Sequence, residues 1–284
     1  MQSHLLSSPS QLSKKCYSKP LHCNKIFAIG YTPVQLHFLM LKHFFATVCA
    51  GFLLTLTACY SPGLQRPFFV PACPVNIPET EILTRKGIDS VLGLLPTVDF
   101  KALDSTYLCY SDPENKFCRK LASQQYYMVK GDQVFWPLVG KYRIGDFMTP
   151  DRYYTQNMRE LCAGHTQYWL VDKKMLYMML DLILALDEKG YNKYGFRVNI
   201  GHRHPAWNDG TPNSAKFSQH IYGRAVDISV RDIDNDFVVT QQDKEIVLTL
   251  LEKIVGSKGG IGKYPGSMGI HFDSRGTKAR WDQH

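Results

Sequence analysis

The sequence has few acidic groups in its first part and only a mild basic surplus in the rest. Residues 1–58 contain five Lys but no Asp, Glu or Arg, and they account for most of the formal net charge of +8. Without these five, 28 of the 33 basic groups remain against 25 acidic groups, a net charge of +3. A surplus of that size does not suit a phosphate-binding surface, so we expect no nucleic-acid partner.

The apolar run at residues 44–56 is shorter than the ~20 residues that a membrane-spanning helix needs. It follows a short basic start and ends in the sequence LTAC, whose last residue is Cys59. These proportions are typical of a secretory signal, and LTAC resembles the lipobox of bacterial lipoproteins, in which the Cys is lipidated. We expect lipidation at Cys59, a lipoprotein signal peptide at 40–58 and a non-native or disordered leader at 1–39. A plain signal peptide and a chance apolar run are the alternatives.

Four cysteines remain after that point, namely Cys73, Cys109, Cys118 and Cys162. No pair among them has the C-x-x-C spacing, which argues against a metal site built from these thiols. An even number in an exported protein favours disulfides. Cys109 and Cys118 flank a turn-rich loop and could close a local bond, but the sequence allows three pairings.

Residues before about 146 give weaker structural signals than those after it. Residues 59–78 are rich in proline and are expected to form an extended tether. Residues 79–145 are interpreted as an accessory β-rich region or an elaboration of the following domain, with a hairpin predicted around Gly131 and Asp132. Residues 146–284 are predicted to form a catalytic domain.

Hydrophobic periodicity predicts two helices and several short strands in residues 146–284. The first helix follows Asp172, with apolar residues at helical spacing and Gly190 as its stop, and the second lies within 243–257. Because these elements are mixed and several strands follow one another, we predict an α+β fold with a small, mostly antiparallel sheet and flanking helices. Strands are predicted at residues 196–201, 224–230, 259–265 and 269–275.

Two histidines and one aspartate form a candidate metal site in this domain. His220 and Asp227 lie in the stretch SQHIYGRAVDI, and His271 lies in GIHFD. Two His and one Asp can bind a zinc ion and leave a fourth position for water, whose pKa falls to roughly 7 on zinc. Taken singly, each residue has a plainer interpretation as a loop His, a strand-end Asp or a half-buried imidazole.

The two stretches together are more specific. SQHIYGRAVDI and GGIGKYPGSMGIHFDSRGTKARW resemble the motifs of the zinc D-alanyl-D-alanine metallopeptidase family, closest to the branch with a short carboxy-terminal H-x-D motif. The resemblance covers roughly residues 146–284. It implies a Hedgehog-like fold, zinc bound by His220, Asp227 and His271, and hydrolysis of peptide bonds in peptidoglycan stem peptides or cross-links. Carboxypeptidase and endopeptidase action, of D,D or L,D type, all fall within it.

The loop IGHRHPAWN is similar to a further element of that family and supplies a candidate catalytic residue. Arg203 aligns with the family's Arg, and its guanidinium is suited to an oxyanion or a substrate carboxylate. The alternative is an exposed loop Arg. His202 and His204 in the same loop are weaker candidates for additional ligands.

The catalytic base departs from the family pattern. The dipeptidase branch has a Glu three residues before the last His, where this chain has Met268. Asp273 is the predicted replacement, because residues i and i+2 of a strand share a face and His271 would therefore point to the same site. The alternatives are that Asp273 orients a ligand or that the protein binds zinc without turnover.

The sequence therefore predicts an exported zinc metallopeptidase of the bacterial cell envelope. Its partners would be peptidoglycan peptides and, through Cys59, the periplasmic face of a membrane. A non-catalytic, zinc-containing cell-wall-binding lipoprotein on the same fold is the main alternative. A weaker one places the function in an interaction module at residues 60–145.

Overall fold

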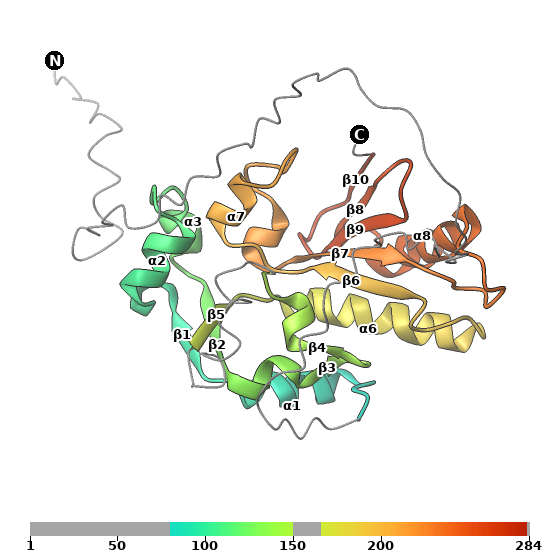
Figure 1. Cartoon of the computed structure of the whole chain (residues 1–284), viewed down its shortest axis with the longest axis horizontal. Coiled ribbons are helices and arrows are strands. Elements are labelled where there is room, and N and C mark those ends of the chain that lie inside the picture. The colour runs from blue at the N-terminus through green and yellow to red at the C-terminus, as the bar shows by residue number, and fades with distance from the viewer. Residues whose placement is uncertain (1–79, 150–165, 283–284) are drawn as a thin grey trace, which may run out of the picture. The chain divides into compact units, whose positions relative to one another are not determined.

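The computed structural model of the chain describes residues 80–149 and 166–282 (Figure 1). These residues form mixed α and β structure with small, mainly antiparallel sheets, as an α+β fold requires. The predicted leader, signal peptide, lipidation site and tether lie outside them. None of the described helices combines the length and the hydropathy of a membrane span.

A five-stranded sheet forms the centre of the carboxy-terminal half. Its spatial order is β10–β8–β9–β7–β6, and every neighbouring pair is antiparallel except β10 and β8. The four strands predicted in this region all form, within two residues of the predicted bounds. The strands are β6 (Phe196–Ile200), β7 (Ala225–Val230), β8 (Gly260–Lys263), β9 (Gly269–Asp273) and β10 (Ala279–Asp282).

Both predicted helices form beside this sheet (Figure 1). Helix α6 (Lys173–Glu188) is capped by Asp172, whose carboxylate accepts a hydrogen bond from the Lys174 amide at 2.8 Å. The chain leaves the helix at Gly190 with a φ of 74°. The apolar face of α6 is completely buried and consists of Met175, Leu176, Met179, Leu182, Ile183 and Leu186.

Helix α8 (Gln241–Val255) packs against α6 and against β7, β8 and β9. Buried Asp243 fixes its start, because its carboxylate accepts hydrogen bonds from the backbone amides of Thr240 and Ile233. The loop after β7 is thereby tied to the first turn of the helix.

A second, three-stranded antiparallel sheet has the order β1–β2–β5 and joins the two described parts of the chain. Short helices flank it. The remaining elements of residues 80–149 and 166–169 are α1 (Arg85–Gly93), β1 (Thr97–Asp99), η3 (Phe100–Ala102), α2 (Ser105–Ser111), α3 (Cys118–Leu121), β2 (Gln125–Lys130), η4 (Gly131–Phe135), β3 (Pro137–Val139), β4 (Tyr142–Arg143), η5 (Ile144–Phe147) and β5 (Thr166–Trp169).

The hairpin predicted around Gly131 and Asp132 is wrong. Strand β2 pairs with β1 and β5, and the residues after it form the 3-10 turn η4 before β3 pairs with β4. The side chain of Gln133 accepts a hydrogen bond from the Lys130 amide at 2.8 Å, which closes this turn locally. Strand β2 is then free to pair with strands far away in the sequence.

Residues 80–149 and 166–282 share one main hydrophobic core. Ile88, Leu138 and Phe147 from the first stretch belong to the same buried cluster as Leu182 and Phe272 from the second. The limits predicted for a separate catalytic domain stay a prediction, but the packing is continuous across them.

Two of the four candidate cysteines lie among the described residues. Cys109 and Cys118 both take part in disulfide bonds. The two other candidate cysteines lie outside the described residues, so the pairing stays a prediction.

The packing of α6 gives a test of the core. Leu182→Ala should lower the free energy of unfolding by about 2–5 kcal/mol, because it removes buried methyl groups and leaves a cavity. Leu184→Ala is the matched control, since Leu184 is 39% exposed on the same helix and should change the free energy by less than about 0.5 kcal/mol. Urea denaturation measures both. Equal losses in the two variants would contradict the described packing of α6.

Candidate metal centre

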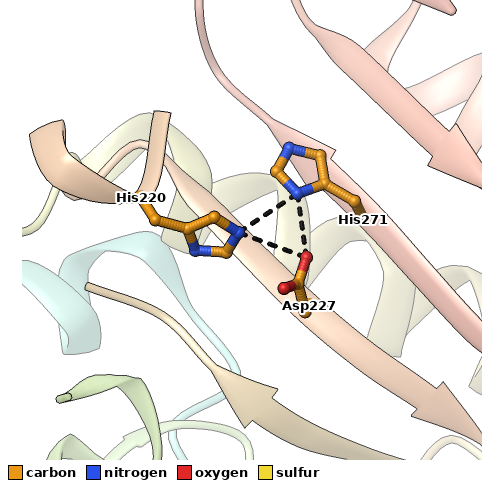
Figure 2. Close-up of side chains that lie close together, drawn as sticks. All are labelled: His220, Asp227 and His271. Atoms are coloured by element: carbon orange, nitrogen blue, oxygen red, sulfur yellow. Dashed lines mark hydrogen bonds and ion pairs between the residues drawn. The ribbon is translucent and has the colours of Figure 1, made fainter. Parts of the chain in front are cut away.

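His220, Asp227 and His271 come together beside β7 and β9, two inner strands of the five-stranded sheet (Figure 2). Asp227 on β7 lies directly opposite His271 in the antiparallel pairing of β7 with β9. His220 lies on the 3-10 turn η6 (Gln219–Tyr222), just before β7. The turn ends at Gly223, which has a φ of 63° and no room for a Cβ atom against the Leu170 backbone. This explains the H-x-x-G spacing.

The three side chains meet at one carboxylate oxygen. Oδ1 of Asp227 lies 3.2 Å from Nε2 of His220 and 2.8 Å from Nδ1 of His271, and these two nitrogens are 3.2 Å apart. All three residues are buried, and their ligand atoms lie within 4.8 Å of one another. The arrangement is therefore that of a possible metal-binding group.

The other nitrogen of each imidazole is held by an acceptor. Nδ1 of His220 lies 2.6 Å from the carbonyl oxygen of Gly201, and Nε2 of His271 lies 3.1 Å from Oδ2 of Asp273. Both partners are acceptors, so in the neutral tautomer with the proton on the nitrogen facing them each imidazole has a lone pair toward Asp227. This is the tautomer that metal-ligating histidines require.

The electrostatics of the group suit a cation. Burial lowers the pKa of His220. Burial also lowers the pKa of His271, but hydrogen bonds with Asp227 and Asp273 outweigh it and raise this pKa, so a metal ion would have to displace a proton there. Burial alone would raise the pKa of Asp227, but its contacts with His220 and His271 outweigh burial and hold this pKa well below its ordinary value. A neutral imidazole and an ionised carboxylate are the forms that bind metal.

Arg203 lies at the site, as predicted, and is not an exposed loop residue. Its Nη2 donates to Oδ2 of Asp227 at 2.7 Å, and its side chain is 11% exposed. The guanidinium thus holds the carboxylate oxygen that the histidines do not contact. Its role toward a substrate stays a prediction.

Asp273 lies on β9 on the far side of the His271 ring from Asp227. Its side chain is fully buried and accepts hydrogen bonds from Arg275, from the Gly260 amide and from Nε2 of His271. Both carboxylate oxygens are therefore occupied, and they face the nitrogen that points away from the candidate metal position. This geometry disfavours the predicted general base and favours the alternative, a residue that orients a ligand.

The two other histidines of the loop are not part of the group. Nδ1 of His204 accepts from the Trp207 amide at 3.2 Å and caps helix α7 (Pro205–Asp209). His202 is buried, and this burial lowers its pKa to about 3. Neither belongs to a metal-binding group among the described residues.

A pocket of about 780 Å³ opens at the candidate site. Three residues of its wall were missed as site residues, although Tyr264, Arg275 and Trp281 stand within the second motif. The Trp281 ring lies 5.1 Å from the His271 ring and packs on Gly262, where a Cβ atom would come within 2.6 Å of the indole. A GIG strand followed by a distant Trp is too weak a signal to predict this contact.

No family model matches the chain, and no curated protein matches it significantly.

The geometry predicts one divalent metal ion per chain. His220→Ala and His271→Ala should each abolish stoichiometric zinc binding, because each removes one of three ligand atoms. His204→Ser is the control, since Ser keeps the helix cap and this imidazole is not a ligand. Isothermal titration with zinc measures the effect. Full zinc occupancy in either alanine variant would remove that histidine from the site.

The position of Asp273 gives a second test. Asp273→Asn should weaken zinc binding by roughly 10–100-fold, as loss of a partner that orients a ligand does. Asp282→Asn, which changes an exposed carboxylate in the pocket wall, should leave the affinity unchanged. An Asp273→Asn variant with unchanged zinc affinity and a rate reduced by about 10²–10⁴-fold would instead indicate a general base.

Proposed function

We propose that the chain is a zinc-dependent metallopeptidase that hydrolyses peptide bonds in peptidoglycan stem peptides or cross-links. The observation that supports this most is the arrangement of His220 and His271. Each directs one ring nitrogen at Asp227 while an acceptor holds the other nitrogen, and the group opens into a pocket.

The donor set fits zinc. Two imidazole nitrogens and one carboxylate oxygen suit this ion, and three protein ligands leave a further position, which is typical of catalytic sites. When bound, zinc would supply an activated water and polarise a substrate carbonyl.

Around that position the chain's own residues act as supports. Arg203 holds the second oxygen of Asp227, and Asp273 orients His271 from the side opposite to the candidate metal position. Each ligand therefore keeps its orientation before substrate binds, which is what a site for a precise reaction needs. Arg203 is also proposed to contact the substrate, because it forms part of the pocket wall.

The pocket suits a peptide. Much of its wall consists of uncharged side chains that can donate to and accept from peptide groups. These are Asn199, Thr211, Asn213, Ser214, Ser218, Gln219, Ser229 and Ser267. The identity of the peptide as a cell-wall stem or cross-link comes from the motif resemblance, as do the Hedgehog-like fold and the exported, lipid-anchored location through Cys59.

A non-catalytic, zinc-containing cell-wall-binding lipoprotein is the second candidate, and one observation favours it. Among the described residues that line the pocket, the carboxylates are Asp227 and Asp282. Asp227 is a ligand candidate, and Met268 stands where the family's dipeptidase branch has a Glu. No carboxylate of the described wall is therefore placed as an obvious base.

Incubation of the zinc-loaded protein with purified peptidoglycan separates the two candidates. A peptidase should release new amino groups and change the muropeptide masses, and a chelator should stop both. His220→Ala, which removes one of the three ligand candidates, should be inactive. Binding to peptidoglycan without any change in muropeptide masses would reject the peptidase and leave the binding lipoprotein.

A further inference from the structure

Tyr264 lies in the turn between β8 and β9, and its side chain faces the candidate metal centre. The hydroxyl donates a hydrogen bond to Oδ1 of Asp227 at 3.3 Å. This is the same oxygen that His220 and His271 contact. The ring also forms part of the pocket wall. The phenol is therefore within reach of a group bound beside that oxygen.

A buried lysine holds the turn in place. Lys244 of α8 is 5% exposed, and its Nζ donates to the carbonyl oxygens of Tyr264 at 2.9 Å and of Ser267 at 2.7 Å. These two carbonyls belong to the two ends of the turn, and the Ser267 amide also donates to Tyr264 at 3.2 Å. Burying an ammonium group is costly unless its donors are satisfied, so this contact ties the turn firmly to the helix.

The ring of Tyr264 also packs closely on Gly269, which has no side chain to keep the ring away. A Cβ atom at Gly269 would lie 2.9 Å from Cδ2 of the ring, closer than such contacts allow. The tyrosine therefore packs directly on the strand that carries His271. Its hydroxyl is positioned by backbone on β9 and by a lysine on α8, two independent supports.

We propose that Tyr264 is a catalytic residue, whose hydroxyl donates a hydrogen bond to the oxygen of the scissile carbonyl as negative charge develops on it. The inference rests on the proposed function. In the addition step a hydroxide oxygen, formed from a water that has released one proton to solvent, bonds to the carbonyl carbon. The π pair of the C=O bond moves onto the carbonyl oxygen, and Tyr264 keeps its proton. When that pair forms the C=O bond again, the C–N bond breaks and the leaving amine takes the hydroxyl proton of the tetrahedral intermediate. A fixed donor is most effective here because it needs no reorientation during the reaction.

Both guanidinium groups of the described pocket wall are paired with carboxylates. Arg203 pairs with Asp227 at 2.7 Å, and Arg275 pairs with Asp273 at 2.6 Å. Each guanidinium is thus partly neutralised by a carboxylate that the site needs elsewhere. Tyr264 makes a single, longer hydrogen bond, which it can exchange for one to substrate at little cost.

Tyr264→Phe tests the inference, because it removes only the hydroxyl. The probe is a phosphinate analogue of a D-alanyl-D-alanine peptide, a stable tetrahedral anion, titrated calorimetrically into zinc-loaded protein. The variant should bind zinc as the wild type does but bind the phosphinate about 10–100-fold more weakly. Its kcat on peptidoglycan peptides should fall about 10²–10³-fold with KM little changed.

Tyr177→Phe is the matched control, since it removes a hydroxyl that hydrogen-bonds Asp89 on α1. It should leave both affinities and the rate unchanged. Equal phosphinate affinity in Tyr264→Phe and wild type, or loss of zinc from Tyr264→Phe, would overturn the inference while the proposed function stands. A wild type that binds no zinc, or that binds zinc but not the phosphinate, would contradict the proposed function and the inference with it.

Discussion

The antiparallel register of β7 with β9 is the constraint on which the candidate site depends. It places Asp227 opposite His271, so a carboxylate and an imidazole from residues far apart in the sequence meet side by side. A slip of one residue would turn one of them to the other face of the sheet. On its other side β9 pairs with β8, which brings Asp273 beside Gly260, and the turn between these two strands packs Tyr264 on Gly269. The buried apolar residues of these strands fix the register, and the polar residues between them form the site.

Charge balance around the site follows from its burial. Buried ions are costly unless they are paired and hydrogen-bonded. Here Asp227 is paired with Arg203, and Asp273 with Arg275, so each carboxylate beside the histidines has its own guanidinium. The ring nitrogen of each histidine that faces away from Asp227 lies against an acceptor, the Gly201 carbonyl for His220 and Asp273 for His271. The group is therefore organised before a cation arrives, and a cation would replace close contacts between donor atoms rather than disturb the surrounding fold.

Local patterns predicted much of this half of the chain, whereas long-range contacts were not predictable. The helix after Asp172 and the strand holding Asp227 follow from hydrophobic periodicity, because each buries one face against the same core. The hairpin at Gly131 failed because strand β2 pairs with strands distant in the sequence. The strand rule correctly placed Asp273 on the face of His271. It could not show which ring nitrogen Asp273 meets, because that depends on Arg275, Gly260 and the side-chain torsions.

No carboxylate of the described pocket wall is placed as an obvious general base. The other side chains of the wall would therefore have to lower the barrier in a different way. Zinc lowers the pKa of a bound water to roughly 7, so a separate base has less to do at neutral pH than it would without a metal. The larger remaining barrier is the negative charge that develops on the substrate oxygen, which preorganised donors reduce most effectively. The described wall offers such donors in Tyr264 and Arg203. Met268, at the position where the dipeptidase branch that the motifs resemble has a Glu, is therefore compatible with the proposed hydrolysis, provided that the donors are held as firmly as Lys244 and Gly269 hold Tyr264.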